Sequence, residues 1–239
     1  MREIIYKRKS VRKYTAEKIS EPLLQKINGF LRTVKPLYEN IAVRMEILPR
    51  DKIHSLFSWT PPQALALYSE EKQGYLENAG FILQQAELYL QSLGLGACWL
   101  GLGKPNQGAK EGTMDGLKYV IMVAFGYPSE EQFRGSDGFK RKSLYEISEQ
   151  KDERLEAARL APSSMNTQSW YFTHEKDVLH VYKRTQTLLK PFPIGKLNQI
   201  DVGIALAHLY VENPQTFTFF ITENHMPLKG MEYEGSIHL

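Results

Sequence analysis

The segment from Asn78 to Gly101 limits the possible folds most, because it has the pattern of one long helix with apolar residues on nearly every side. Asn78 can cap the first turn, and Gly94 can adopt the left-handed conformation that ends a helix. About 20 apolar residues can also span a bilayer, but three glutamines and Glu87 in the middle of this segment argue against a membrane helix. We therefore expect a buried helix at the centre of the molecule.

A second, shorter helix of the same kind is predicted from Asp201 to Asn213, with Asp201 as its N-cap and Pro214 beyond its end. The two helices begin alike, with Asn78-Ala79-Gly80 in the first and Asp201-Val202-Gly203 in the second. The segments around the two helices also correspond. In the first copy a shorter helix (23–33), a proline-containing loop (35–38) and a strand-like run (43–48) precede the central helix, and a short apolar run (119–125) follows it. In the second copy the equivalent segments are 154–160, 161–164 and 170–173 with 178–182 before the helix, and 217–221 after it. Such internal similarity indicates a duplicated unit.

The sequence therefore predicts an α+β fold made of two diverged halves, residues 1–150 and 151–239, packed as a pseudo-dimer around the two central helices. The polar runs 129–142 and 148–154 are the only segments that resemble a linker, and neither is a Gly/Ser tether. We expect the halves to be in contact and the central helices to pack together along a pseudo-two-fold axis.

Composition excludes several classes of protein. A chain with 42% hydrophobic and 24% charged residues is typical of globular proteins, and its net charge of +3 is too small to indicate nucleic-acid binding. The single cysteine, Cys98, excludes an intrachain disulfide, and the charged N-terminus lacks the apolar core of a secretory signal. The sequence shows no spacing typical of a metal site or a Ser-His-Asp triad. We expect a cytoplasmic protein without a nucleic-acid or membrane partner.

The basic run Arg8-Lys9-Ser10-Val11-Arg12 is the first candidate binding site. One turn of chain would bring two guanidinium groups and a hydroxyl to one anion. This donor set suits a phosphate monoester, which carries about −1.5 to −2 charges. The run is equally compatible with a solvated basic segment or a weak nucleic-acid tail.

Two later runs also have more than one interpretation. The glycine-rich run Gly94–Gly101 follows a helix, whereas the glycine loop of a dinucleotide-binding fold follows a strand and opens a helix. The run is compatible with a helix C-cap followed by core residues. The run Ala161–Trp170 is compatible with a turn followed by a packed indole.

Together, and in this order, these segments resemble the FMN-dependent nitroreductase family. The basic run resembles its Arg-x-Ser-x-Arg signature, and Leu93–Gly96 resembles its Leu-Gly-Leu-Gly segment. Gly126-Tyr127-Pro128 followed by Arg141-Lys142-Ser143-Leu144 resembles a turn and a basic run of the family, with Ser143 in place of a proline. Ala161–Trp170 is similar to its Ala-Pro-Ser-x-x-Asn-x-Gln-Pro-Trp motif, with Ser169 in place of the second proline.

The resemblance implies which residues hold the flavin. The phosphate would contact a mostly basic set: Arg8, Lys9, Ser10, Arg12, Arg141 and Lys142. The backbone of Leu100 and Gly101 would face the N5 edge of the ring. The proline-containing loop would contact the ring or its surroundings through Pro162, Ser163, Ser164, Asn166 and Gln168. The Asn166 amide could offer both a donor and an acceptor to the polar edge of the ring.

In the family's homodimers this loop reaches the flavin held by the other subunit, whereas here it lies in the second half of the same chain. The first half keeps the phosphate-binding run but has Lys35-Pro36-Leu37-Tyr38 where the loop should be. The pattern resembles the fused, single-chain, pseudo-dimeric subgroup of nitroreductase-like proteins. It implies one FMN per chain, in a site completed without a second subunit.

The implied activity is that of an FMN-dependent oxidoreductase. In this chemistry flavin N5, with no catalytic side chain, carries electrons from NAD(P)H to a small acceptor such as a nitroaromatic or a quinone. The alternative is a non-catalytic flavin-binding or structural protein that retains the nitroreductase fold.

Overall fold

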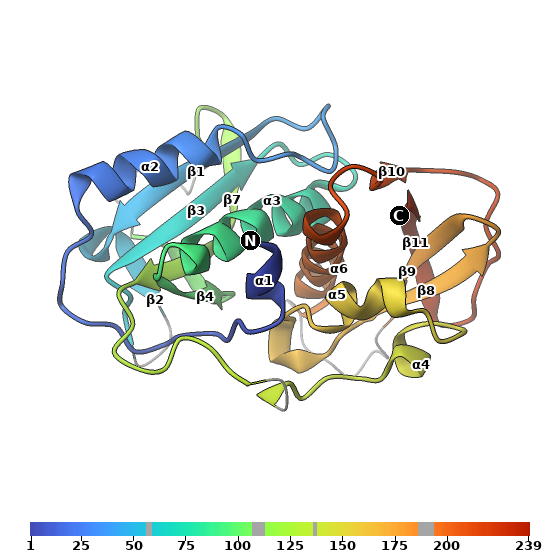
Figure 1. The fold of residues 1–239 in the computed structure, drawn as a ribbon. Helices are drawn as coiled ribbons and strands as arrows, with labels where there is room; N and C mark the ends of the chain where they lie inside the picture. Colours follow the sequence, from blue (N-terminus) through green and yellow to red (C-terminus); the bar gives the residue numbers. More distant parts are fainter. Residues whose placement is uncertain (56–58, 107–112, 136–137, 186–193) are drawn as a thin grey trace.

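The apolar runs form the strands of two antiparallel sheets, which lie on opposite sides of the central helices (Figure 1). The structure is a computed structural model that describes residues 1–55, 59–106, 113–135, 138–185 and 194–239. The first sheet has the order β1-β3-β7-β4, and β6 also pairs with β7. Its strands are β1 (Val43–Pro49), β3 (Gln63–Ser69), β4 (Gly96–Leu100), β6 (Thr113–Met114) and β7 (Leu117–Gly126).

The second sheet has the order β10-β11-β9-β8. Its strands are β8 (Trp170–Glu175), β9 (Val178–Arg184), β10 (Thr218–Phe220) and β11 (Met231–His238). A small third sheet pairs β2 (Ile53–Ser55) with β5 (Gly103–Pro105). The strand runs predicted from apolar pattern are confirmed, as is the α+β class, whereas β2, β4, β5, β6 and β11 were not predicted.

Two long helices, α3 (Tyr75–Ser92) and α6 (Ile194–Glu212), cross between the sheets (Figure 1). A Cβ atom added at Gly80 of α3 would overlap the carbonyl oxygen of Ile200, and one added at Gly203 of α6 would overlap that of Glu77. The overlaps are reciprocal, because Gly80 and Gly203 occupy equivalent positions in the two repeats. Only glycine allows this approach of the two backbones, so the predicted packing about a pseudo-two-fold axis is confirmed.

The predicted starts of both central helices are wrong. α3 begins at Tyr75 and α6 at Ile194, so Asn78 and Asp201 lie inside their helices and cap neither. Asn78 Oδ1 instead accepts hydrogen bonds from the backbone N–H groups of Leu37 and Tyr38, at 2.8 and 3.1 Å. Both carboxylate oxygens of Asp201 lie 3.0 Å from the backbone nitrogen of Ser164. Each central helix thus uses the same position to hold the proline-containing loop of its own repeat.

The remaining helices are short, apart from α2. They are α1 (Arg2–Ile5), α2 (Glu21–Leu31), α4 (Leu144–Ile147) and α5 (Glu156–Arg159), with single 3₁₀ turns η1 (Arg50–Lys52), η4 (Glu153–Leu155) and η5 (Ser164–Asn166). α2 packs beside α3 through stacked rings of Phe30 and Tyr89, whose centroids lie 3.8 Å apart. The division of the chain at residue 150 stays a prediction. Helix α4, just before that point, packs on β8 of the second sheet.

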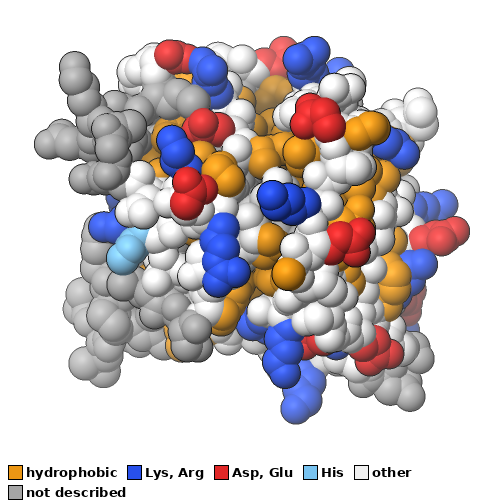
Figure 2. Space-filling model, turned by 90° about the vertical axis from the view of Figure 1, so that its left-hand side faces the viewer, with side chains coloured by type: hydrophobic (Ala, Val, Ile, Leu, Met, Phe, Trp, Pro, Cys, Tyr) orange, Lys and Arg blue, Asp and Glu red, His pale blue; other side chains and the backbone are white. Residues whose placement is uncertain are grey.

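The outer surface carries both signs of charge. Figure 2 shows the left-hand side of the molecule, where Lys and Arg side chains are interspersed with Asp and Glu around exposed apolar atoms. This mixture agrees with the net charge of +3. Within the described ranges, no helix is both long enough and apolar enough to cross a membrane.

Candidate functional site

A cavity of about 470 Å³ lies where the N-terminal run, the end of β4, the loop after α5 and helix α6 meet. Its wall is mainly apolar, with Arg12 and Asp201 as its charged members. The lining residues are Ser10, Arg12, Cys98, Trp99, Gly101, Leu102, Ile121, Pro162, Ser163, Ser164, Met165, Leu197, Ile200, Asp201 and Ile204. The fold thus brings to one cavity six residues predicted for the flavin site: Ser10, Arg12, Gly101, Pro162, Ser163 and Ser164.

Three buried or half-buried arginines gather beside the N-terminal run. A β-bridge between Arg8 and Phe133 places Arg134 next to Arg8, whose side chain is 1% exposed. Burial, and then repulsion from Arg8, lowers the pKa of Arg134. Burial, followed by repulsion from Arg8, Arg134 and Arg159, lowers the pKa of Arg141 to about 10. The Nε atom of Arg134 is buried without a hydrogen-bond partner. Such a concentration of like charge favours an anion.

Glu87 of α3 fixes the position of Arg8. Its Oε1 atom accepts from Arg8 Nε at 3.0 Å and lies 2.8 Å from Arg8 Nη2, and the Glu87 side chain is fully buried. Gln84 and Gln91 donate two further hydrogen bonds to the same carboxylate. Arg8 Nη2 also donates to Ser10 Oγ at 3.4 Å. Because both charges are buried and well bonded, the pair holds the guanidinium in one place next to the cavity-lining Ser10.

The same network continues to the cavity wall through Gln84. Trp99 Nε1, whose indole lines the cavity, donates to Gln84 Oε1 at 2.9 Å. His208 of α6 lies 3.1 Å from Gln84 Nε2 and 2.9 Å from the carbonyl oxygen of Ala157. Burial lowers the pKa of His208 to about 3, so the ring is neutral. Nδ1–H must then donate to Ala157 while Nε2 accepts from Gln84, which orients the Gln84 amide and, through it, the indole.

The opposite wall is a backbone loop in an unusual conformation. Met165, Asn166 and Gln168 have positive φ angles of 50°, 57° and 47°, which residues other than glycine rarely adopt. Asp201 holds the start of this loop through Ser164. Lys142 Nζ holds its end by donating to the carbonyl oxygens of Thr167 and Gln168 at 3.0 and 2.9 Å. The anchors keep the loop against the cavity in spite of its backbone strain.

Several predicted site residues have other partners. The ammonium group of Lys142 bonds to this loop and not to the arginine cluster. Asn166 Oδ1 accepts from Arg141 Nη1 at 2.8 Å, and its Nδ2 donates to the carbonyl oxygen of Lys140, so the amide does not point into the cavity. Gln168 is buried and accepts from the backbone N–H of Lys142. The side chain of Leu100 packs in a separate cluster with Met122. Lys9 contributes a carbonyl oxygen to Gln91.

Two residues at the candidate site were not expected from the sequence. Arg134 lies in the polar run that was interpreted as a linker, and the only signal was an arginine after an aromatic residue in that run. Asp201 was interpreted as a helix cap, yet it lines the cavity with 3% exposure. Burial raises the pKa of Asp201 to about 8, although hydrogen bonds from Ser164 and Thr167 act in the opposite direction. Among the described residues, no group of His, Cys, Asp and Glu side chains could hold a metal ion.

Comparison with solved structures identifies the fold. A nitroreductase from Thermotoga maritima, described as putative, is 21% identical with a TM-score of 0.65, and the match covers 99% of this chain and 91% of that chain. A nitroreductase family protein from Clostridium difficile 630 is 19% identical with a TM-score of 0.49, over 62% of this chain and 95% of that chain. An FMN-dependent nitroreductase from Clostridium difficile R20291 is 17% identical with a TM-score of 0.45, over 59% and 95%. A search of curated proteins finds no match.

The family model described as "Putative TM nitroreductase" matches residues 1–213. This span includes the basic run, both central helices and every residue that lines the cavity. The sequence resemblance to nitroreductases is thereby confirmed, and the chain belongs to this nitroreductase family, with the nitroreductase-like α+β fold.

Proposed function

We propose that the protein is an FMN-dependent oxidoreductase that passes electrons from NAD(P)H to a small acceptor such as a nitroaromatic or a quinone. The observation that carries the proposal is the cluster of Arg8, Arg134 and Arg141 beside Ser10, at one end of an apolar cavity. Membership of a nitroreductase family supports an oxidoreductase.

The arginine cluster suits the phosphate of FMN. Burial, followed by repulsion from neighbouring arginines, lowers the pKa of Arg134 and Arg141, and a phosphate carrying about −1.5 to −2 charges would relieve that repulsion. It would also provide an acceptor for the buried, unpartnered Nε of Arg134. Arg12, which lines the cavity, adds a further guanidinium group, and Ser10 adds a hydroxyl, so that the donors suit a phosphate. In this proposal Arg134 takes the role that the sequence assigned to Lys142.

The cavity suits the flavin ring. Its volume of about 470 Å³ lies within the range of small-ligand pockets, and isoleucines 121, 200 and 204 give it apolar walls. Gly101 lines it without a side chain, so backbone can approach a bound ring. Bound FMN would supply the redox chemistry, by accepting hydride at N5 and passing electrons on. The chain's own residues would bind the phosphate, orient the ring between Trp99 and the strained loop, and exclude water.

One chain is sufficient for this site. The phosphate-binding run and Gly101 come from the first half, and Pro162, Ser163 and Ser164 come from the second. The loop equivalent to 161–164 in the first half carries Tyr38, whose ring packs against Phe219 with centroids 5.2 Å apart. The contact between Tyr38 and Phe219 therefore lies at the loop that would face a flavin in a second, pseudo-symmetric site. We therefore propose one FMN per chain, held between the halves.

The test is anaerobic titration of the FMN-loaded protein with NADH and NADPH, followed by addition of a nitroaromatic or a quinone. We expect bleaching of the visible flavin absorbance and its recovery on addition of the acceptor. A yellow protein that neither donor bleaches would be a flavin-binding protein without turnover, and a protein without affinity for FMN would favour a structural role. Either result would refute the proposed activity.

Variants of the phosphate site test the assignment itself. Loss of a hydrogen bond to a charged group costs about 1.5–3 kcal/mol, so Arg134→Gln should weaken FMN binding roughly 10- to 150-fold. Arg32→Gln, which alters an exposed arginine after α2, is the matched control and should leave binding unchanged. Equal losses in both variants would mean that a diffuse positive field attracts the anion.

A further inference from the structure

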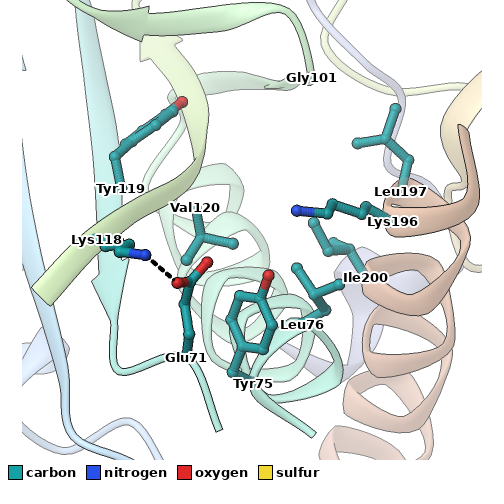
Figure 3. Close-up of a pocket in the computed structure, with 10 residues that line it drawn as sticks. All are labelled: Glu71, Tyr75, Leu76, Gly101, Lys118, Tyr119, Val120, Lys196, Leu197 and Ile200. Atoms are coloured by element: carbon teal, nitrogen blue, oxygen red, sulfur yellow. Dashed lines mark hydrogen bonds and ion pairs between the residues drawn. The ribbon is translucent and has the colours of Figure 1, made fainter. Parts of the chain in front are cut away.

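Two of the hollows in the surface meet the cavity at residues that they share with it. One is a niche of about 160 Å³ that shares Gly101 with the cavity, and there Glu71 and Lys118 form an ion pair with each other (Figure 3). The other is a groove of about 1040 Å³ that shares Arg12 with the cavity. Sites for small molecules typically measure about 300–1,000 Å³, so the groove has room for a large part of a second substrate and the niche does not.

The groove carries more basic than acidic side chains. Its charged lining residues are Arg12, Lys13, Lys18 and Arg50, with Glu17 and Asp51. All six are exposed, and none forms an ion pair with another residue in the described part of the chain. Glu130 accepts the backbone N–H groups of Arg12 and Lys13 at 2.7 and 3.3 Å, which fixes the chain that carries two of the cations. Even with Glu130 counted, the basic groups outnumber the acidic ones, so the groove favours an anion.

Two aromatic rings also line the groove. The ring centroids of Tyr14 and Trp59 lie 6.1 Å apart, with an angle of 42° between the ring planes. The hydroxyl of Tyr14 donates to the carbonyl oxygen of Val11 at 2.7 Å, and a β-bridge joins Tyr14 to Pro128. These contacts hold the ring of Tyr14 in place while part of it stays exposed. A fixed ring beside several cations suits a nucleotide, whose base stacks on the ring and whose phosphates contact the cations.

We propose that this groove binds the adenosine diphosphate half of NAD(P)H, with adenine against Tyr14 and Trp59 and the pyrophosphate near Lys18 and Arg50. The inference rests on the proposed function, in which the nicotinamide ring must reach the flavin in the cavity. From there, the rest of the donor leaves the cavity at Arg12, which lines both spaces. The two cations assigned to the pyrophosphate come from separate segments, Arg50 from η1 and Lys18 from the chain before α2.

The test compares a complete donor with a truncated one. 1-Benzyl-1,4-dihydronicotinamide keeps the ring that gives up hydride and lacks the adenosine diphosphate half. The second-order rate constant of flavin bleaching is measured by stopped flow for this compound and for the better of NADH and NADPH. The quantity of interest is the ratio of the two constants, complete donor over truncated donor. A defect in folding or in flavin binding affects both donors and leaves the ratio unchanged.

The ratio is measured in wild type, Lys18→Gln, Arg50→Gln and the double variant. Loss of one exposed charge contact weakens binding about 1.5- to 5-fold, so each single variant should lower the ratio by that factor and the double variant by roughly 2- to 25-fold. Arg32→Gln removes an exposed cation at the end of α2, outside the groove, and is the matched control. It should leave the ratio unchanged, whereas a diffuse positive field would lower the ratio in all the variants alike.

Binding without turnover gives an independent readout. Calorimetric titration of the FMN-loaded protein should show that ADP binds more tightly than inorganic pyrophosphate, because only ADP has a base to stack. ADP should compete with the complete donor and not with the truncated one, and it should bind more weakly to both single variants. Equal affinities for ADP and pyrophosphate, ADP binding without competition, or a ratio that is constant across the variants overturns this inference alone. If neither donor bleaches the flavin, the proposed function fails and this inference fails with it.

Discussion

Replacing Asp201 with asparagine should stabilise the protein at high pH without releasing the loop that Asp201 holds. Asp201 accepts from the backbone of Ser164, and Asn78 does the equivalent work for Leu37 and Tyr38 in the other repeat. An amide side chain is therefore sufficient to hold a loop of this shape. The two positions differ in that only Asp201 can ionise.

The size of the effect follows from the pKa of Asp201. Burial raises that pKa to about 8, whereas an aspartate in an unfolded chain titrates near 3.9. Between these values the folded protein holds a proton that the unfolded chain has released, so the free energy of unfolding decreases as the pH rises. A shift of about four units corresponds to at most about 6 kcal/mol. Asparagine does not titrate, so the variant should lack this decrease.

The assay is urea unfolding of the apo-protein, followed by circular dichroism at several pH values from about 5 to 8.5. We expect the two proteins to be within about 1 kcal/mol at the acidic end, and Asp201→Asn to be more stable by about 2–5 kcal/mol at the basic end. The reverse exchange, Asn78→Asp, is the control and should introduce a further loss of stability with rising pH. Parallel stability curves for wild type and Asp201→Asn would refute the reasoning.

Three further outcomes follow from buried contacts. Gly203→Ala places a Cβ on the carbonyl oxygen of Glu77 and should lower the free energy of unfolding in urea by at least about 1–3 kcal/mol. The control is Gly29→Ala in α2, which has no atom within 4 Å of the new methyl group and should be neutral or stabilising. Equal effects of the two substitutions would contradict the close crossing of the helices. Arg8→Met leaves Glu87 buried without its cation and should cost about 3–5 kcal/mol, far more than Arg12→Met at the exposed rim, in the same assay. Burial and the neighbouring Glu77 raise the pKa of Glu234 to about 9, so Glu234→Gln should reduce the loss of stability that occurs as the pH rises from about 4.5 to about 9. An unchanged pH profile would argue against a raised pKa.

The sequence was informative wherever a pattern was local. The apolar runs at 43–48 and 119–125 became β1 and β7, because residues in a strand bury their side chains with a short, regular period. The paired glycines, Gly80 and Gly203, revealed the repeat because the helix crossing tolerates no side chain at either position. The basic run and the loop at 161–170 could be related to a family for the same reason, since each keeps its motif within a few residues.

The sequence was misleading where a residue's partner lies far along the chain. An asparagine or aspartate before an apolar run has the appearance of a helix cap, but Asn78 bonds to a loop about 40 residues earlier and Asp201 to one 37 residues earlier. Lys142 carries the positive charge expected of a phosphate ligand, yet its ammonium group donates a hydrogen bond to the loop 26 residues later in the chain. Arg134 lies next to Arg8 because Phe133 bridges to Arg8, a pairing that no local pattern contains.

The central claim, a single flavin site completed within one chain, is tested most directly by FMN stoichiometry. Apo-protein is titrated with FMN while the mass of the species in solution is measured, for example by light scattering after size exclusion. We expect saturation at one FMN per chain, with FMN bound by the monomer or by a dimer whose flavin site lies within each chain. Saturation at two FMN per chain, or binding only by a dimer that places Asn166 of one chain at the flavin of the other, would contradict the claim.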